Sequence, residues 1–291
     1  MIDVTHFTDP GCPWAYSVWP AHATLRWRYG DGLRWTNVMI GLTEEAAQYE
    51  ARGYTPARSA IGYERFRRFG MPFQITPKAR LSATSPGCRA VVAVRLTAPP
   101  LEEVALRALQ LAQFTTTGTL DDPDTLRSAL AAVDGLDADA IVGRIDDPEV
   151  VAAYETDRGR ARTAAGSPTE FQSRAANTDG AVRYTAPSLI FEASDGQRLE
   201  AGGFQPVEAY DVVIANLDST LERRPPADDP IDVLNAFPFA LTTVEVAAVM
   251  TEHLGVPDLA GVEAALITAT GEGRVTRRAA GDGSLWAPAQ P

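Results

Sequence analysis

The composition of this chain limits the kinds of partner that its surface can bind. Its 291 residues, of which 45% are hydrophobic, are enough to bury a full core in one large domain or two smaller ones. The formal net charge of −12 disfavours nucleic acid or an anionic membrane as the main partner, because both attract clustered positive charge.

The few cysteines and histidines limit the kinds of disulfide and metal site that this chain can form. Two cysteines, Cys12 and Cys88, are too few for a disulfide framework and indicate reactive or buried thiols. His6, His22 and His253 have no metal-ligand spacing, so we expect no metal site, and we interpret His6 and His22 as surface residues. A strand is predicted from residue 2 with no basic segment or cleavage site before it, and no stretch approaches about 18 consecutive apolar residues. We therefore expect a cytoplasmic protein without a membrane span.

The amino-terminal segment predicts a strand, a turn and a helix. Apolar and polar residues alternate over residues 2–7, and the turn residues at 9–11 end this strand. Pro13 suits the first position of a helix, and apolar residues follow it at helical spacing: Val18, Ala21, Leu25 and Tyr29. Cys12 therefore begins a helix, where free N–H groups and the helix dipole can lower a thiol pKa to roughly 3.5–7.5 from about 8.5. We expect Cys12 to be a nucleophilic thiolate.

Residues 7–16 form a motif around Cys12. They read Phe7-Thr8-Asp9-Pro10-Gly11-Cys12-Pro13-Trp14-Ala15-Tyr16. This run resembles the opening of DsbA-family thioredoxin-fold proteins, which include FrnE-like and mycothiol-linked disulfide oxidoreductases and a branch of 2-hydroxychromene-2-carboxylate isomerases and kappa-class glutathione transferases. The resemblance implies that Cys12, Pro13 and Trp14 belong to the catalytic site. The redox members of the family carry Cys-Pro-Trp-Cys, whereas this chain has Ala15 at the position of the second cysteine.

The remaining elements fit the two halves of a thioredoxin unit. A second strand at residues 33–40 completes a parallel β-α-β unit. Helical segments broken by proline and glycine then follow, at residues 63–69, 88–97, 101–115, 123–133 and 137–144. We interpret residues 43–175 as a helical insertion. Strands and a last amphipathic helix return after it, at residues 181–184, 187–192, 198–200 and 207–223.

Two short segments in the second half match landmarks of the same family. They are Tyr184-Thr185-Ala186-Pro187 and Gly203-Phe204-Gln205-Pro206. In the family, the proline at the position of Pro187 is cis and packs beside the reactive cysteine, and the preceding residue presents its backbone to an extended substrate. The resemblance therefore implies that Ala186 and Pro187 bind the substrate next to Cys12.

The last part of the chain is predicted to be a separate module. A charged, proline-rich linker at residues 222–230 precedes two helices and a hairpin, which indicate a winged-helix-like unit over residues 231–291. This tail contains three arginines against seven acidic residues, and its would-be recognition helix, residues 259–270, has no basic residue. We therefore expect no DNA binding and interpret the tail as an intramolecular cover or a protein-binding module.

Cys88 and an arginine cluster each have a functional and a structural interpretation. Cys88 lies in a segment, residues 85–91, that resembles the start of an insertion helix over the family's active site. It either faces Cys12 or is a buried thiol without a redox role. Residues 158–162 contain three arginines, which either bind an anionic thiol such as glutathione or mycothiol or belong to a solvated helix face.

Together these features predict an α/β protein with a thioredoxin fold, a large helical insertion and a small winged-helix-like domain. The predicted domains are residues 1–42 with 176–224, residues 43–175 and residues 231–291. The favoured function is a DsbA-family thiol-disulfide oxidoreductase that acts on a small-molecule or protein thiol or disulfide, with Cys12 as its single nucleophile. Ala15 excludes an internal dithiol cycle, so an external thiol, glutathione or mycothiol, or Cys88 resolves the mixed disulfide.

Two other functions stay open at this point. One is a glutathione-dependent isomerase or transferase of the 2-hydroxychromene-2-carboxylate isomerase type, in which the active-site residue activates a bound thiol and needs no second cysteine. The other is a non-catalytic adaptor that uses the fold as a binding platform. The sequence indicates no bound cofactor and leaves the oligomeric state open.

Overall fold

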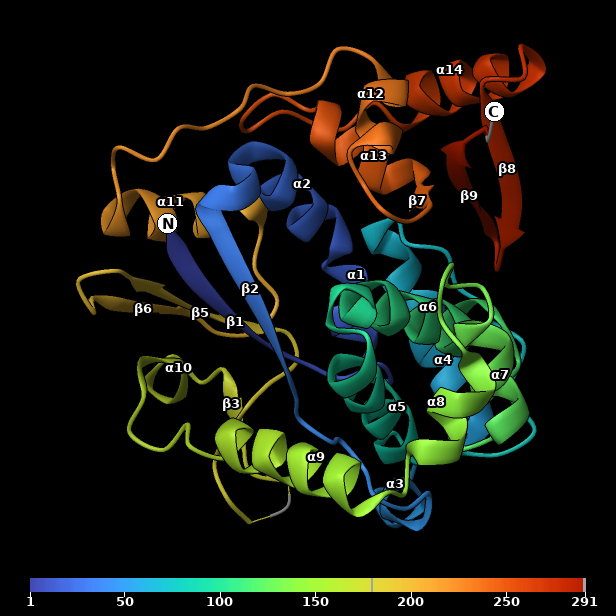
Figure 1. The fold of residues 1–291 in the computed structure, drawn as a ribbon, viewed down its shortest axis with the longest axis vertical. Helices are drawn as coiled ribbons and strands as arrows, with labels where there is room; N and C mark the ends of the chain where they lie inside the picture. Colours follow the sequence, from blue (N-terminus) through green and yellow to red (C-terminus); the bar gives the residue numbers. More distant parts are fainter. Residues whose placement is uncertain (179, 290–291) are drawn as a thin grey trace.

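A four-stranded mixed sheet forms the centre of the thioredoxin-like part (Figure 1). The computed structural model describes residues 1–178 and 180–289. The strand order is β2-β1-β5-β6, and the bounds are β1 (Ile2–Thr8), β2 (Leu33–Met39), β5 (Ser188–Ala193) and β6 (Arg198–Ala201). β1 runs parallel to β2 and antiparallel to β5, and β6 runs antiparallel to β5. β1 is therefore a central strand, and its carboxyl end leads to Cys12.

Two helices pack against this sheet and share its core. They are α2 (Trp19–Tyr29) and α11 (Val207–Leu217), and the apolar cluster beneath them includes Ile2, Leu25, Phe191 and Tyr210. The short helix α1 (Pro13–Ser17) joins β1 to α2. Pro13 occupies the first turn of α1, where a missing N–H leaves no helical hydrogen bond unmade. The chain thus turns from the central strand directly into a helix that begins after Cys12.

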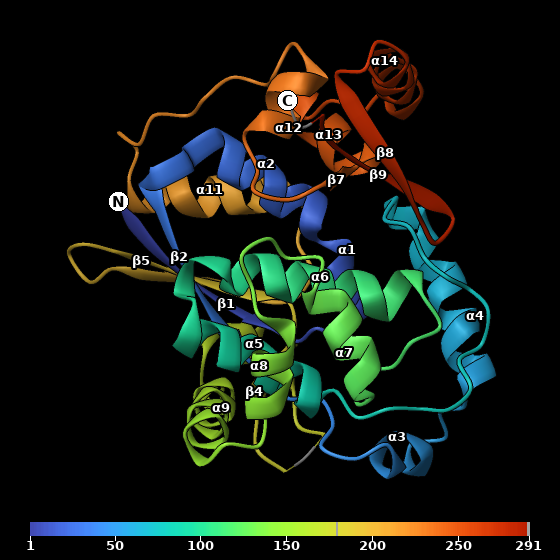
Figure 2. The same ribbon diagram turned by 45° about the vertical axis from the view of Figure 1, so that its right-hand side comes forward.

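The segment between β2 and β5 is mostly helical (Figure 2). It contains α3 (Ala47–Ala51), α4 (Pro56–Phe66), α5 (Ser85–Thr97), α6 (Glu102–Thr115), α7 (Pro123–Leu130), α8 (Ala138–Arg144), α9 (Pro148–Ala161), α10 (Pro168–Phe171), β3 (Ala175–Ala176) and β4 (Arg183–Tyr184). Its 3₁₀ turns are Arg67–Phe69 and Pro99–Leu101, and another, Gly30–Gly32, precedes β2. The buried side chains of α5 form the centre of a core with α6, α7, α8 and α9. The predicted helical insertion is present, although the apolar pattern did not predict α9, and only its end at residues 158–161 was considered as a helix face.

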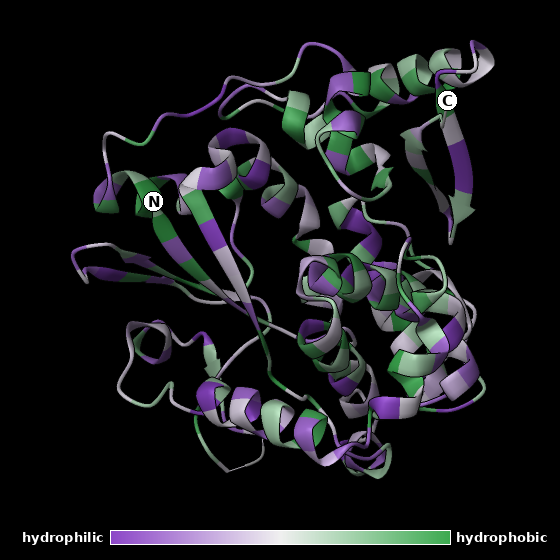
Figure 3. Cartoon of the chain, in the orientation of Figure 1, coloured by the Kyte–Doolittle hydropathy of each residue, from purple (hydrophilic) through white to green (hydrophobic). Residues whose placement is uncertain are grey.

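The carboxyl-terminal tail contains three helices and a three-stranded sheet. Its elements are α12 (Pro230–Asn235), β7 (Leu241–Thr242), α13 (Thr243–Met250), α14 (Leu259–Gly271), β8 (Val275–Ala280) and β9 (Gly283–Pro288), and the strand order is β7-β9-β8. Hydrophobic residues recur along α14, in which Glu263 is the only charged side chain (Figure 3). No helix in the described part of the chain is both long enough and apolar enough to cross a membrane.

The tail packs directly on α2 and α6. Ala23 and Trp27 of α2 belong to the same apolar cluster as Val246 and Trp286 of the tail. Arg107 of α6 donates two hydrogen bonds to the Glu245 carboxylate, at 2.6 and 2.7 Å, and both side chains are at most 1% exposed. A buried apolar contact and a buried ion pair therefore hold the tail in one place.

Candidate active site

Cys12 lies at the N-cap of α1, as its position before Pro13 predicts. Its backbone N–H donates to the Asp9 carbonyl at 3.1 Å, and its carbonyl accepts from the Tyr16 N–H at 3.0 Å. The thiol is 5% exposed and donates to the Ala186 carbonyl oxygen at 3.1 Å. The backbone N–H groups of Trp14 and Ala15 point toward the sulfur. The sulfur thus has donors from the start of α1 on one side and a carbonyl on the other.

The Ala186 carbonyl belongs to a strand end that the sheet register brings to Cys12. The peptide bond between Ala186 and Pro187 is cis, and both residues are buried. β5 begins at the next residue, Ser188, which pairs with Phe7 near the end of β1. Because β1 and β5 are antiparallel neighbours, the start of β5 lies beside the loop that follows β1. The structure therefore brings Cys12, Ala186 and Pro187 together.

The protonation state of Cys12 differs from the sequence-based expectation. Burial, with a smaller contribution from the Asp9 charge, raises the pKa of Cys12 to about 12, although the backbone N–H groups of Ala15 and Trp14 and the Arg183 charge act to lower it. Burial outweighs the helix N-terminus because an ionised thiol in an apolar cluster loses most of its hydration. At neutral pH Cys12 is a thiol in this closed arrangement. The predicted lowering of its pKa is wrong for this state.

The position of the missing second cysteine is also buried. Ala15 is 1% exposed and packs in the same apolar cluster as Cys12. Cys12 and Cys88 are both free thiols.

In the described residues no group of three or more His, Cys, Asp or Glu side chains is arranged to hold a metal ion.

Cys88 lies in the first turn of α5, with its thiol directed at Asp9. Its sulfur is 3.4 Å from the Asp9 Oδ2 atom, and the side chain is fully buried. Burial, with the nearby Asp9 charge, raises the pKa of Cys88 well above its ordinary value. Cys88 packs in the α5-centred core, whereas Cys12 packs in a different cluster. The Cys88 thiol therefore donates a hydrogen bond to the Asp9 carboxyl group. This contact favours a role for Cys88 in holding the loop that leads to Cys12.

Asp9 belongs to the site, although the sequence predicted only that it forms part of a turn. Its Oδ1 atom accepts from the Gly11 N–H at 2.7 Å, and its Oδ2 atom accepts from the Leu42 N–H at 2.8 Å and the Thr84 hydroxyl at 3.0 Å. Burial raises the pKa of Asp9, and these donors lower it. One carboxylate therefore ties the Cys12 loop to the segment after β2 and to α5. An aspartate two residues before a glycine in a turn was the available signal.

An aromatic cluster surrounds Trp14, two residues after Cys12 in the chain. Trp14 is 40% exposed, and its ring centroid lies 4.7 Å from that of Phe66, 5.6 Å from Phe69 and 5.5 Å from Phe204. Phe66 and Phe69 belong to the insertion, and Phe204 follows β6. We call Trp14, Phe66, Phe69 and Phe204 the aromatic platform. The sequence indicated Trp14 but not the partners that the insertion supplies.

Two further expectations change in the structure. His6 and His22 are 3% and 1% exposed, so their interpretation as surface residues is wrong. The centroids of their rings lie 4.8 Å apart. Burial lowers the pKa of His6 to about 3 and that of His22 well below its ordinary value, so both rings are neutral.

The arginine cluster at residues 158–162 binds groups of the chain itself. Arg158 pairs with Glu44 at 3.2 Å, and Arg162 donates to the Ile40 carbonyl at 2.9 Å. At least two arginines of this cluster bind groups of the chain itself.

Comparison with solved structures identifies the fold. The chain is similar to a candidate protein disulfide isomerase from Nitrosomonas europaea, with a TM-score of 0.56 and 17% identity over 74% of this chain and 96% of that chain. A candidate DsbA oxidoreductase from Streptomyces coelicolor gives a TM-score of 0.56 and 16% identity, with 78% and 93% of the two chains covered. The chain has a DsbA-type thioredoxin fold. The cytosolic disulfide reductase DsbM from Pseudomonas aeruginosa gives a TM-score of 0.50 and 17% identity, with 75% and 100% covered.

These likenesses are structural, because sequence identity is low throughout. No protein-family model matches the sequence, and no curated protein sequence matches it. The predicted resemblance to DsbA-type thioredoxin-fold proteins is confirmed at the level of the fold. The solved structures are covered almost completely, whereas about a quarter of this chain lies outside each likeness.

Proposed function

We propose that the protein is a thiol-disulfide oxidoreductase in which Cys12 is the only nucleophilic cysteine and a low-molecular-weight thiol completes the cycle. The observation that carries this proposal is the position of the Cys12 sulfur. It lies at the start of α1 and 3.1 Å from the carbonyl that precedes the cis proline Pro187. Ala15 and the hydrogen-bonded, fully buried Cys88 leave no second cysteine ready to act.

The proposed cycle has two thiol-disulfide exchange steps. In the first, the Cys12 thiolate attacks a substrate mixed disulfide, a sulfur–sulfur bond forms to Cys12, and the other half of the substrate leaves as a thiolate that takes up a proton. In the second, the thiolate of an external thiol attacks the Cys12 mixed disulfide and releases Cys12 as a thiolate. Each turnover consumes one external thiol, which leaves joined by a disulfide bond to the half of the substrate that was held on Cys12. With a glutathionylated substrate and glutathione, the products are the free substrate thiol and glutathione disulfide. Glutathione and mycothiol both have the required chemistry.

The raised pKa of Cys12 defines what the first step requires. With its pKa raised to about 12, Cys12 is almost entirely a thiol at pH 7. The N–H groups of Trp14 and Ala15 already point at the sulfur, so contact of the sulfur with water or a polar substrate removes the main opposing cause, which is burial. We propose that substrate binding on the aromatic platform exposes the Cys12 sulfur.

Glutathione is the first thiol to test. The DsbM structure, to which this chain is similar at a TM-score of 0.51, is also solved with GSH. For this chain we propose Ala186 and Pro187 as the backbone side of the substrate site and Trp14 as its apolar side. Cys88, with its thiol on Asp9, is proposed as a positioning residue and not as the resolving thiol.

The protonated state of Cys12 favours one alternative function. In a glutathione-dependent isomerase or transferase, the active-site residue donates a hydrogen bond to a bound thiolate and does not attack. A buried Cys12 thiol with a pKa of about 12 can serve as such a donor. The Cys12→Ser variant distinguishes the two functions. Serine still offers a hydrogen-bond donor, through its hydroxyl, but it is not an effective nucleophile in disulfide exchange.

We propose that the tail is a winged-helix-like module that covers part of the thioredoxin-like unit and does not bind DNA. Its order of elements is helix, strand, helix, helix, strand, strand, and β7 pairs with β9. α14 stands where a recognition helix would be, yet its one charged side chain is the acidic Glu263. Phosphate binding needs positive charge at this place. We further propose the predicted domain limits and a cytoplasmic location.

Intact-mass measurement after exposure to oxidised glutathione at pH 9 tests the proposal. The wild-type protein and Cys88→Ser should each gain the mass of one glutathionyl group, and Cys12→Ser should gain none. A wild-type protein that forms no adduct, or an adduct that persists in Cys12→Ser and disappears in Cys88→Ser, contradicts the assignment of Cys12.

A further inference from the structure

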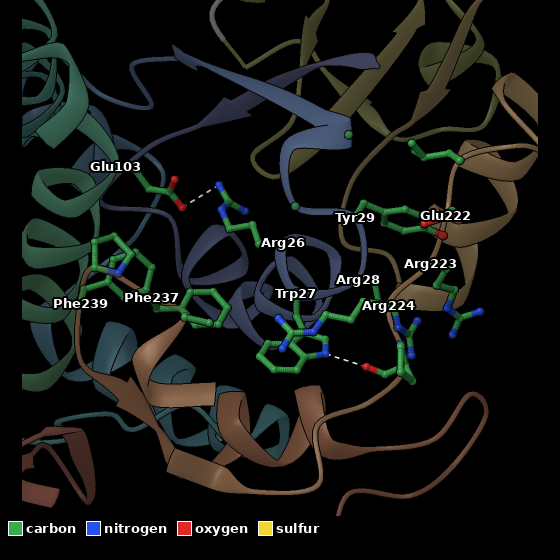
Figure 4. A pocket seen from close by; sticks show the side chains of 16 residues that line it. Arg26, Trp27, Arg28, Tyr29, Glu103, Glu222, Arg223, Arg224, Phe237 and Phe239 are labelled. Atoms are coloured by element: carbon green, nitrogen blue, oxygen red, sulfur yellow. Dashed lines mark hydrogen bonds and ion pairs between the residues drawn. The ribbon is translucent and has the colours of Figure 1, made fainter. Parts of the chain in front are cut away.

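A large cavity lies away from the Cys12 site, at the junction between α2 and the tail (Figure 4). It is lined by the carboxyl-terminal half of α2, by Glu103 of α6 and by residues 221–225 and 236–239. Its volume is about 870 Å³. Cavities of roughly 300–1,000 Å³ are typical of small-molecule sites, so this one has room for a compound of nucleotide size.

The cavity is richer in positive charge than the rest of the protein. Its charged lining residues are Arg26, Arg28, Arg223, Arg224, Glu103 and Glu222. The whole chain, in contrast, has 38 acidic against 26 basic residues. Arg28 is paired with Asp211 at 2.5 Å and is buried. Arg223 lies 3.5 Å from the same Asp211 carboxylate. The donors that remain for a ligand are therefore found mainly on Arg224.

Arg224 presents an exposed guanidinium that stacks on Trp27. Its Cζ atom lies 3.4 Å from the centroid of the Trp27 ring, and its backbone N–H donates to the Arg28 carbonyl at 2.8 Å. Within the described residues no carboxylate forms an ion pair with Arg224. Stacking on an indole fixes the plane of the guanidinium and leaves the N–H groups at its edge free to donate. Arg224 is thus held at the cavity wall with donors to spare.

Arg26 supplies a second set of donors. Its Nη2 atom pairs with Glu103 at 2.6 Å, and its Cζ atom lies 3.9 Å from the centroid of the Trp35 ring. Its Nη1 atom is buried and has no hydrogen-bond partner among the described residues. A buried donor without a partner has lost its hydrogen bonds to water, so the Arg26 side chain is incompletely satisfied. The Arg26 guanidinium is therefore held by Glu103 and by the Trp35 ring, while its Nη1 atom lacks a hydrogen-bond acceptor among the described residues.

The cavity also has an apolar wall. Phe237 and Phe239 line it, with ring centroids 5.8 Å apart, and both are half-buried. Figure 4 shows these rings on the Arg26 side of the cavity and Trp27 beneath Arg224. We propose that this cavity binds a small planar aromatic or heteroaromatic compound that carries a carboxylate or phosphate group. The ring packs on the phenylalanine wall, on the Arg26 side of the cavity, and the anion accepts from Arg224.

The site connects the tail to the helix that leads away from Cys12. Trp27 of α2 and Phe237 and Phe239 before β7 also pack in the apolar cluster that joins α2 to the tail. A ligand in the cavity contacts both sides of this junction, so its binding should stabilise the docked tail. A compound that binds only the native state raises the melting temperature by an amount that grows with the logarithm of the ratio of its concentration to its Kd.

Isothermal titration calorimetry on the full chain tests the site with two anionic ring compounds, adenosine 5′-monophosphate and 2-naphthoate. Adenosine and 2-naphthol serve as uncharged counterparts, and inorganic phosphate serves as an anion without a ring. We expect at least one anionic ring compound to bind ten or more times more tightly than its uncharged counterpart and than phosphate. Binding of adenosine 5′-monophosphate alone assigns a phosphate ligand, and binding of 2-naphthoate alone assigns a carboxylate ligand.

Three variants locate the binding. Arg224 is exposed, so Arg224→Gln should fold normally and lower the affinity at least tenfold. Arg65→Gln removes an exposed arginine of α4 outside the cavity and should change the affinity less than twofold. Cys12→Ser should leave the affinity unchanged. Absence of binding by both anions, equal binding of the uncharged compounds, an equal loss in Arg65→Gln, or loss of binding in Cys12→Ser each overturns the proposal.

Discussion

The ion pair between Arg107 and Glu245 is expected to hold the tail on the rest of the molecule. Each Glu245 carboxylate oxygen accepts from one guanidinium nitrogen, at 2.6 and 2.7 Å, and the two side chains are 1% and 0% exposed. The substitution Glu245→Gln keeps the shape of the side chain and its capacity to cap α13, but it leaves the Arg107 charge buried without a counter-charge. Removing one partner of such a pair costs about 3–5 kcal/mol.

Urea unfolding of wild-type protein and Glu245→Gln measures this loss. The matched control is Asp124→Asn, because Asp124 forms an exposed i,i+3 pair with Arg127 in which the side chains are 89% and 44% exposed. Exposed pairs contribute about 0–1 kcal/mol, so the control should change the free energy of unfolding by less than about 1 kcal/mol. A Glu245→Gln variant as stable as Asp124→Asn would show that the ion pair does not hold the tail.

Three further outcomes follow from the site. The rate of Cys12 alkylation by iodoacetamide should keep rising with pH above 9, because a thiol whose pKa is raised to about 12 stays largely protonated there. A rate that levels off near pH 8.5 would contradict this. Asp9→Asn should shift this profile to lower pH, since the Asp9 charge raises the Cys12 pKa, and an upward shift would contradict the electrostatic assignment. Ala15→Cys restores the Cys-Pro-Trp-Cys pattern and should form a disulfide with Cys12 on mild oxidation, seen as a loss of titratable thiols relative to Ala15→Ser with the same oxidant.

The sequence predicted those parts of the site that local chemistry determines. The strand before Cys12, the helix after it and the start of β5 after Pro187 follow from alternation, a turn signal and a proline at the helix start, together with the resemblance of the motifs. These features depend on residues close in the chain. The helices α6, α7 and α8 were indicated for the same reason, because each carries a regular apolar stripe.

The properties that the sequence did not predict depend on distant contacts. Cys12 shares its apolar cluster with Ile40, Ala161 and Tyr184, which come from three other parts of the chain, and their combined burial reverses the expected pKa shift. α9 was missed because one of its buried positions at helical spacing is a charged residue, Asp157, which accepts from the Met39 N–H at 2.9 Å. An acidic residue on a buried helix face interrupts the apolar pattern.

Steady-state reduction of a glutathionylated peptide, with glutathione as the only other thiol, tests the central claim most directly. The account predicts parallel lines in double-reciprocal plots against the two substrates, because Cys12 forms a mixed-disulfide intermediate before glutathione reacts. Cys88→Ala should retain most of the wild-type kcat/KM, and Cys12→Ser should fall to the uncatalysed rate. Full activity of Cys12→Ser, or an equal loss in both variants, would contradict the assignment of Cys12 as the single nucleophile.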